Sequence, residues 1–332
     1  MKTEESQSTG NINFDSRIPL EELQQAVENL KKQLANVIIG QKDFVELLIV
    51  GMLADGHVLI EGVPGIAKTI TAKLFAKSVQ TNFSRIQFTP DLMPSDILGT
   101  SVLNQASEFE FKPGPIFSNI ILIDEINRAP AKTQAALFEV MEERQITIDS
   151  KRHTMQKPFM VLATQNPIEQ EGTYALPEAQ LDRFLFKINV AYPSLEEEIK
   201  ILESHHQRKA KEATEMVEPV LSPELLQKFK TQIHEIKIEP KILNYIAAIV
   251  DKTRNHPHLF LGASPRASIA IMRAAKVFAA IQARDFVTPE DVKKALNPVL
   301  SHRILLAPER EMEGIKPEQV IEMITQSVEI PR

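Results

Sequence analysis

The chain of 332 residues contains no cysteine. Disulfide bonds, thiolate metal sites and thiol nucleophiles are therefore excluded, and a reducing compartment, the cytoplasm, is the expected location. Long apolar runs are also missing. The longest, at 44–60, is interrupted by charged and small residues, so no membrane span is expected. The first residues include Glu4 and Glu5 but no apolar stretch, so no secretion signal is expected either.

A surplus of basic residues is absent as well. The chain has 44 acidic and 38 basic residues, which gives a net charge of −6. Proteins that bind nucleic acids usually present a basic face, so nucleic acid is not the expected partner. A local basic patch is still compatible with this net charge. The remaining composition, 43% hydrophobic and 25% charged, is that of an ordinary globular protein long enough for two domains.

Strand and helix signals alternate through the first part of the chain. Residues 1–16 are polar and predict a flexible arm, and short apolar runs then alternate with helical patterns up to residue 192. This alternation predicts an α/β core at 17–192, with a mainly parallel sheet and helices on both of its faces. Beyond it, helical spacing dominates and predicts a smaller, all-helical domain at 193–332. Helices are expected at 19–34, 69–79 and 131–143, and strands at 57–60, 85–88, 120–123, 159–163 and 184–190.

Two insertions interrupt this alternation. Residues 100–117 alternate in places between apolar and polar side chains and contain Pro-Gly-Pro. Residues 145–159 fit a β-hairpin whose polar tip lies at 150–152. The tip fits a solvated turn, or a contact with a substrate.

The most informative segment is the octapeptide GVPGIAKT at 62–69. It follows an apolar strand, precedes a helical pattern, and matches the phosphate-binding template G-x-x-x-x-G-K-[ST] except at Ala67. Gly62 and Gly65 permit the turns that aim backbone N–H groups at a phosphate, and Pro64 stiffens the bend. Taken alone, the segment also fits an ordinary turn between strand and helix. The predicted nucleotide-binding residues here are Gly62, Val63, Pro64, Gly65, Ile66, Ala67, Lys68 and Thr69.

Four side chains in two motifs have the chemistry of magnesium–nucleotide binding. Lys68 is placed to reach the β- and γ-phosphates, and Thr69 to offer its hydroxyl to Mg²⁺. Asp124 and Glu125 end the apolar run at 119–123, which predicts carboxylates at the rim of a parallel sheet. Asp124 is expected in the Mg²⁺ shell, directly or through water, and Glu125 is expected to polarise the attacking water.

Three further polar side chains stand at strand or helix ends. Asn166 follows the fourth expected strand, where an amide would hold the attacking water; a turn before proline accounts for it equally. Arg183 precedes the last strand, on a surface where it either meets a neighbouring subunit's nucleotide or forms a salt bridge with Asp182 or Glu178. Arg266 lies in the first turn of a helix opened by proline, so it either faces the nucleotide cleft or is solvated.

Taken together, these elements resemble the AAA+ superfamily, and within it the MoxR family of chaperone-like ATPases. The resemblance spans about residues 36–306. The departure at Ala67 looks like the form that this family's loop often takes. The strings that carry the resemblance are EGVPGIAKT at 61–69, FTPDLMPSD at 88–96, FKPGPIF at 111–117, DEINRAP at 124–130, MEERQ at 141–145, ATQNP at 163–167, LPEAQLDRF at 176–184 and GASPR at 262–266.

The resemblance assigns roles to individual residues. It implies a P-loop NTPase core of the AAA+ type followed by a helical lid, with the two insertions as marks of its helix-2-insert clade. Residue by residue, it implies Lys68 and Thr69 as the Walker A pair, Asp124 and Glu125 as the Walker B pair, Asn166 as sensor 1, Arg183 as the arginine finger, Arg266 as sensor 2, and Ile38, Gly40 and Gln41 in the segment that lines the adenine pocket.

The resemblance also implies a function and partners. Family members are expected to form homo-oligomeric rings, often hexamers, to bind ATP and Mg²⁺, and to work with von Willebrand factor A domain proteins in maturing other complexes or inserting their cofactors. The expected activity is therefore Mg²⁺-dependent ATP hydrolysis that remodels a client protein. Three alternatives stay open on the sequence: a nucleic-acid motor, a magnesium-chelatase-like subunit, and a nucleotide-switched scaffold that hardly turns ATP over.

Overall fold

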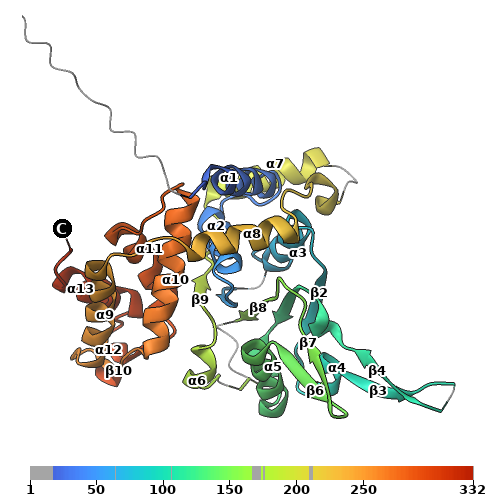
Figure 1. Ribbon diagram of the computed structural model, residues 1–332. Coiled ribbons are helices and arrows are strands. Elements are labelled where there is room, and N and C mark those ends of the chain that lie inside the picture. The colour runs from blue at the N-terminus through green and yellow to red at the C-terminus, as the bar shows by residue number, and fades with distance from the viewer. Residues whose placement is uncertain are drawn as a thin grey trace, which may run out of the picture.

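A five-stranded parallel sheet forms the centre of the computed structural model (Figure 1). The described residues are 18–331 except Pro64, Ala106, 167–172, Ala175 and 209–211. The arm expected at 1–16, and Pro64 of the predicted loop, therefore lie outside them. The parallel pairing confirms the expected α/β architecture. In sheet order the strands are β2 (Phe83–Gln87), β5 (Ile120–Asp124), β8 (Met160–Gln165), β1 (Val58–Glu61) and β9 (Phe186–Asn189).

Separate apolar cores cover the two faces of this sheet. The helices of this part are α1 (Glu21–Ala35), α2 (Lys42–Leu53), α3 (Lys68–Ser78), α4 (Pro94–Leu98) and α5 (Ala131–Glu143), with 3₁₀ turns η1 (Pro115–Phe117) and η2 (Ile126–Arg128). In β1, Val58 and Ile60 point into the core shared with α1, α2 and α3, and Leu59 into the core shared with α4 and α5. The central strands β5 and β8 read as nearly continuous apolar runs in the sequence because both of their faces are covered, whereas the edge strand β2 is largely polar.

Both predicted insertions are antiparallel hairpins that lie next to each other (Figure 1). They pair β3 (Gly99–Leu103) with β4 (Phe109–Pro113), and β6 (Gln145–Ile148) with β7 (Lys151–Thr154). Ring centroids of Phe111 and His153, one on each hairpin, lie 4.4 Å apart. The second turn is at Asp149 and Ser150, where φ is 51° and 63°, as a two-residue hairpin turn requires. The predicted tip at 150–152 is therefore one residue too late.

The C-terminal region is helical, as predicted, with one small addition. A short antiparallel strand pair, β10 with β11, was not expected, because strands of three and two residues leave no periodic signal in the sequence. Within the described residues no helix has the length and apolar character needed to cross a membrane. The short helix α6 (Glu178–Leu181) still precedes β9. The elements after β9 are α7 (Leu195–Arg208), η3 (Ala213–Met216), α8 (Pro223–His234), α9 (Pro240–Arg254), β10 (Leu259–Leu261), α10 (Pro265–Ile281), α11 (Pro289–Leu300), β11 (Leu305–Leu306), α12 (Pro308–Met312) and α13 (Pro317–Ser327).

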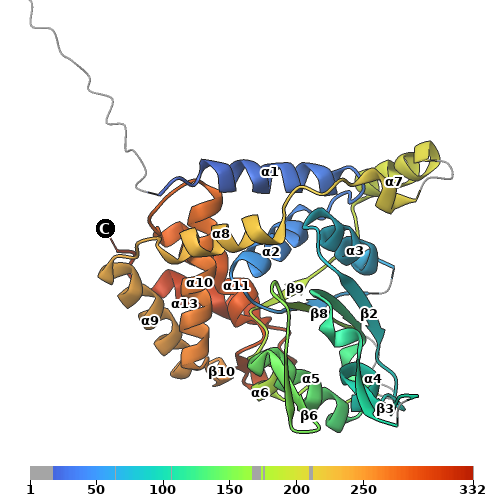
Figure 2. The ribbon, with the colours of Figure 1, turned by 45° about the vertical axis from the view of Figure 1, so that its right-hand side comes forward.

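One apolar core continues from the sheet into the helical region. Phe75 of α3 and Phe186 of β9 belong to the same cluster of buried side chains as Phe229 of α8 and Ala274 of α10. Figure 2 shows α8 and α10 beside α1 and α2, and these helices are in contact. The helical region is therefore packed onto one face of the sheet rather than tethered to it by a linker.

Two buried histidines make this fold sensitive to acid. Nδ1 of His57, just before β1, accepts a hydrogen bond from the Val161 amide, and Nε2 donates one to the Met141 carbonyl, both at 3.0 Å. Burial, reinforced by the charge of Arg144, lowers the pKa of His57 from 6.5 to about 4. Burial also lowers the pKa of His302 well below its ordinary value.

We expect the free energy of unfolding to fall as the pH drops from about 6.5 to about 4. In this window the unfolded chain binds protons at His57 and His302 that the native chain does not, so the contribution is fully present only above it. For His57 alone the loss amounts to roughly 3 kcal/mol, at about 1.4 kcal/mol per pKa unit. Urea unfolding across this range measures it, and His57→Gln should flatten the slope. An identical slope in that variant would contradict the assignment.

Candidate functional site

The predicted nucleotide loop connects the end of β1 to the start of α3. Its backbone takes left-handed φ values at Gly65 (85°) and Ala67 (59°). This conformation costs an L-residue roughly 1–2 kcal/mol, which explains why the general template has glycine where this chain has Ala67. Gly62 is needed for a different reason. A Cβ there would lie 2.6 Å from the Ile66 side chain and 2.8 Å from the Val190 carbonyl oxygen.

Lys68 opens α3 and lies close to both predicted carboxylates. Its Nζ donates to the Gly62 carbonyl at 2.7 Å. Burial lowers the pKa of Lys68, and the negative charges of Asp124 and Glu125 oppose that shift. Thr69 follows as the second residue of α3. The structure thus brings the lysine, the hydroxyl and the two carboxylates of separate motifs to one edge of the sheet.

Asp124 ends β5 and has a partner on each carboxylate oxygen. Arg85 Nε lies 2.6 Å from its Oδ2, and Thr164 Oγ1 donates to its Oδ1 at 3.2 Å. Arg85 comes from the neighbouring strand β2, and its side chain is 52% exposed. A guanidinium therefore lies where a cation bound by Asp124 would lie, and such a cation must displace it or bind through an intervening water.

Glu125, the next residue, has a left-handed backbone with φ 58°. Strain of this kind at a non-glycine residue clusters at functional sites. Gln87 Nε2 donates to its Oε2 at 2.8 Å, and Arg128 Nε lies 3.1 Å from the same oxygen. The Glu125 amide donates to Thr164 Oγ1 at 3.0 Å. Gln87 of β2 and Arg128 of η2 thereby hold the Glu125 carboxylate.

The other predicted nucleotide residues surround this edge. Asn166, 9% exposed, follows β8, the strand beside β5. Gln41 Nε2 donates to the Ile66 carbonyl at 2.9 Å. The buried Oε1 of Gln41 accepts no hydrogen bond from the described chain, which leaves an acceptor for the amino group of a base. Ile38 and Gln41 line a cavity of about 280 Å³ between α1 and α2, and Gly40 lies against the Glu197 side chain of α7.

Arg183 and Arg266 meet at the opposite edge of the sheet. Arg183 precedes β9, whereas the loop follows the parallel strand β1, which spans about 13 Å. Arg183 Nη1 lies 3.0 Å from one oxygen of Glu142, and Arg266 Nη2 lies 2.7 Å from the other. The alternative partners suggested by the sequence, Asp182 and Glu178, are wrong, because the end of α5 brings Glu142 closer. Neither arginine reaches the loop of its own chain.

This edge is hollow and basic. Arg183 and Arg266 line a cavity of about 550 Å³ together with Arg144, Lys157 and Arg273. The carboxylates among its lining residues are fewer than the cations, so the cavity attracts anions.

Comparison with known proteins identifies the family. Residues 57–186 match the ATPase family associated with various cellular activities (AAA), and residues 251–324 match the AAA lid domain. The uncharacterised protein YeaC of Bacillus subtilis is 46% identical over 312 residues, covering 93% of this chain and 95% of YeaC. Chaperone MoxR1 of Mycobacterium tuberculosis is 43% identical over 320 residues, covering 93% of this chain and 82% of MoxR1. The chain belongs to the MoxR family of AAA+ ATPases.

A solved structure extends the match to the whole MoxR-family fold. The crystal structure of a candidate ATPase from Cytophaga hutchinsonii has a TM-score of 0.88 and 40% sequence identity, and the match covers 94% of this chain and 97% of that one. Core and lid are therefore arranged in this chain much as in that protein.

Sequence reasoning missed three polar residues of this MoxR-family site: Arg85, Gln87 and Thr164. They come from β2 and β8, the two strands that flank β5, and Gln87 is in register with Asp124. Arg85 and Gln87 are two residues apart, so their side chains lie on the same face of β2. That spacing indicates two polar side chains on one face of β2, but it points to the site only once the strand order is known.

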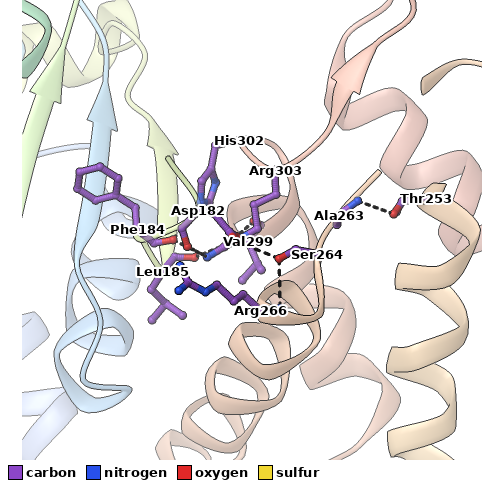
Figure 3. A network of polar contacts seen from close by, with 10 residues as sticks. All are labelled: Asp182, Phe184, Leu185, Thr253, Ala263, Ser264, Arg266, Val299, His302 and Arg303. Carbon is purple, nitrogen blue, oxygen red and sulfur yellow. Dashed lines mark hydrogen bonds and ion pairs between the residues drawn. The ribbon is translucent and has the colours of Figure 1, made fainter. Parts of the chain in front are cut away.

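A buried ion pair ties the lid to the segment that carries Arg183 (Figure 3). Nε of Arg303, whose side chain is 3% exposed, lies 2.7 Å from Asp182. The other Asp182 oxygen accepts a hydrogen bond from Ser264 at 3.0 Å, and Ser264 also caps the helix that begins just before Arg266. Arg183, the predicted arginine finger, and Arg266, the predicted sensor 2, therefore both lie beside one polar network.

Arg303→Met is expected to lower the free energy of unfolding by about 3–5 kcal/mol, because it leaves the Asp182 charge without its buried partner. Urea unfolding measures the loss. Asp182→Asn combined with Arg303→Met should lose less than the single variant, because no buried charge is left unpaired. A loss below about 1 kcal/mol would instead be typical of a solvent-exposed pair.

Proposed function

We propose that this chain binds ATP with Mg²⁺ at the loop and hydrolyses it to ADP and phosphate. The observation that carries the proposal is the convergence of Lys68 with Asp124 and Glu125 at one edge of the sheet. Open α/β sheets bind their ligands outside the carboxyl ends of the strands, where these residues lie. The buried, unbonded Oε1 of Gln41 beside the loop adds an acceptor that fits adenine.

Each side chain then has a definite task. Lys68 and the backbone N–H groups of the loop bind the β- and γ-phosphates, and Thr69 and Asp124 hold the cation. Mg²⁺ supplies charge neutralisation at those phosphates. Glu125 takes a proton from the attacking water as the water oxygen bonds to the γ-phosphorus, and Asn166 orients that water. The bond from the γ-phosphorus to the β–γ bridging oxygen breaks, and ADP leaves with that oxygen. To take that proton, Glu125 must leave the contact with β2 that the structure shows.

The site becomes complete only between two copies of the chain. Arg183 and Arg266 lie at the opposite edge of the sheet from their own loop, joined through Glu142. Both therefore serve the nucleotide of a neighbouring copy, where a guanidinium stabilises the charge that develops on the transferred phosphoryl group. A homo-oligomeric ring, with a hexamer as the expected size, provides this geometry at every boundary.

The cellular role that we propose is based on the relatives of this chain in the MoxR family. One relative at 43% identity is named a chaperone. We place this chain in the cytoplasm as a chaperone-like ATPase that remodels a partner complex, with a von Willebrand factor A domain protein as its adaptor and metal or cofactor insertion as the outcome.

Phosphate release from ATP by the purified chain tests the proposal. Release should require Mg²⁺ and fail in excess EDTA. Lys68→Ala should weaken nucleotide binding roughly 10- to 100-fold, because a charged hydrogen bond contributes about 1.5–3 kcal/mol. Lys73→Ala, which removes an exposed lysine of the same helix, is the matched control. Equal loss in both variants, or none in either, would refute the assignment.

A further inference from the structure

Helix α7 presents an apolar stripe that the described chain leaves exposed. Among the described helices of more than five residues, only α7 has no buried residue. Leu195, Ile199 and Leu202 are 76%, 47% and 66% exposed. Their spacing of four and three residues places them on one face, together with Glu198. A contiguous exposed apolar face of this kind marks an interaction site.

This helix lies beside the nucleotide loop. Its Glu197 carboxyl is so close to Gly40 that a Cβ on that glycine would lie 2.5 Å from the Glu197 Cδ. Gln41, the next residue, is hydrogen-bonded to the loop at Ile66. Figure 2 shows α7 next to α3 at one end of the molecule, with α5 and α6 at another. The stripe therefore lies on the side of the chain that carries the nucleotide loop, away from Arg183 and Arg266.

A complementary stripe lies on α10 at the opposite edge. Arg266, Ile269, Ala270 and Arg273 are spaced as one helix face, and all four line the cavity that also contains Arg183. Ile269 is 49% exposed. On α10 the apolar side chains thus lie between two arginines, whereas on α7 the apolar side chains lie beside glutamates. The acidic residues of α7 are Glu196, Glu197, Glu198 and Glu203.

We infer that α7 of one copy docks on this face of α10 of a second copy. The inference rests on the proposed function, which already brings the second copy's Arg183 to the loop. Arg183 shares a carboxylate and a cavity with Arg266, so the copy that delivers Arg183 also brings α10 toward α7. Ile269 then covers the leucine and isoleucine stripe, and the flanking arginines, Arg266 and Arg273, meet the carboxylates of α7.

Cross-linking between single-cysteine chains tests the contact, because the chain has no cysteine of its own. Leu202→Cys and Ile269→Cys chains are mixed with Mg²⁺ and a non-hydrolysable ATP analogue, then treated with a short bismaleimide. We expect covalent dimers between the two variants. Leu202→Cys mixed with Leu243→Cys, an exposed site on α9, is the control and should give few. Equal yields from both mixtures, or dimers of Leu202→Cys with itself in preference, would overturn the inference.

Substitution within the stripe gives a second readout. Ile199→Asp should raise the concentration needed for half-maximal assembly about tenfold, the effect of losing a central interface contact of about 1.4 kcal/mol. Leu243→Asp is the matched control, and circular dichroism verifies that both variants fold. The docking is overturned, while the proposed ring stands, if Ile199→Asp assembles normally and the Leu202→Cys and Ile269→Cys chains give no cross-link. Light scattering without any ATP-dependent assembly overturns both.

Discussion

Glu125→Gln is expected to lower ATP turnover about 10²- to 10⁴-fold, the range attributed to a positioned general base. The amide keeps the shape of the side chain but cannot accept the proton of the attacking water. Nucleotide affinity should stay within about threefold, because phosphate binding falls to Lys68 and the loop rather than to this carboxylate. Phosphate release at saturating ATP and titration with a fluorescent nucleotide measure the two quantities separately.

Glu139→Gln is the matched control for this variant, since it changes an exposed glutamate of α5 outside the site. It should leave turnover unchanged. Undiminished turnover in Glu125→Gln would remove Glu125 from the mechanism. A parallel collapse of nucleotide binding would instead show that the carboxylate holds the loop together, with Arg128 and Gln87 as the contacts to examine.

Arg183→Ala is expected to lower turnover about 10³- to 10⁵-fold, as removal of an arginine finger does in other NTPases. The sharper result comes from mixing these chains with Glu125→Gln chains. Each variant is inactive alone, yet a mixed ring contains boundaries where an intact Glu125 meets an intact Arg183 from the neighbour. Activity should therefore return on mixing, well above the sum of the two separate rates.

Arg152→Ala, which removes an exposed arginine of the β6–β7 hairpin, is the control and should need no such rescue. Failure of the mixture to regain activity, while light scattering shows that mixed assemblies form, would place Arg183 in a structural role. The Arg183 contact with Glu142 would then be its main task.

Many elements of this fold were readable from the sequence because their signals are local, whereas α2 and the short pair β10–β11 were not among the predicted elements. The helix predicted at 131–143 has the bounds of α5, and the loop motif lies between β1 and α3 as expected. What was missed depends on strand order. Arg85 reaches Asp124 because β2 lies beside β5, although 39 residues separate them.

The contact of Arg183 and Arg266 with Glu142 could not be predicted from the sequence for a similar reason. Glu142, Arg183 and Arg266 come from three segments far apart in the chain, and no periodic pattern in the sequence indicates that their side chains are in contact. The motifs predicted the individual side chains, while the packing of α5 and α10 decides that the two arginines share the Glu142 carboxylate.

The apolar core that α8 and α10 share with α2 and α3 has a mechanical consequence. Hinging the lid away from the sheet inside one copy would open that core to water, at about 25 cal/mol for each Å² of apolar surface exposed. Rotation of whole copies against each other breaks no such core. In the proposed ring, motion is therefore expected at the interface between copies, and each chain is expected to move as one rigid body.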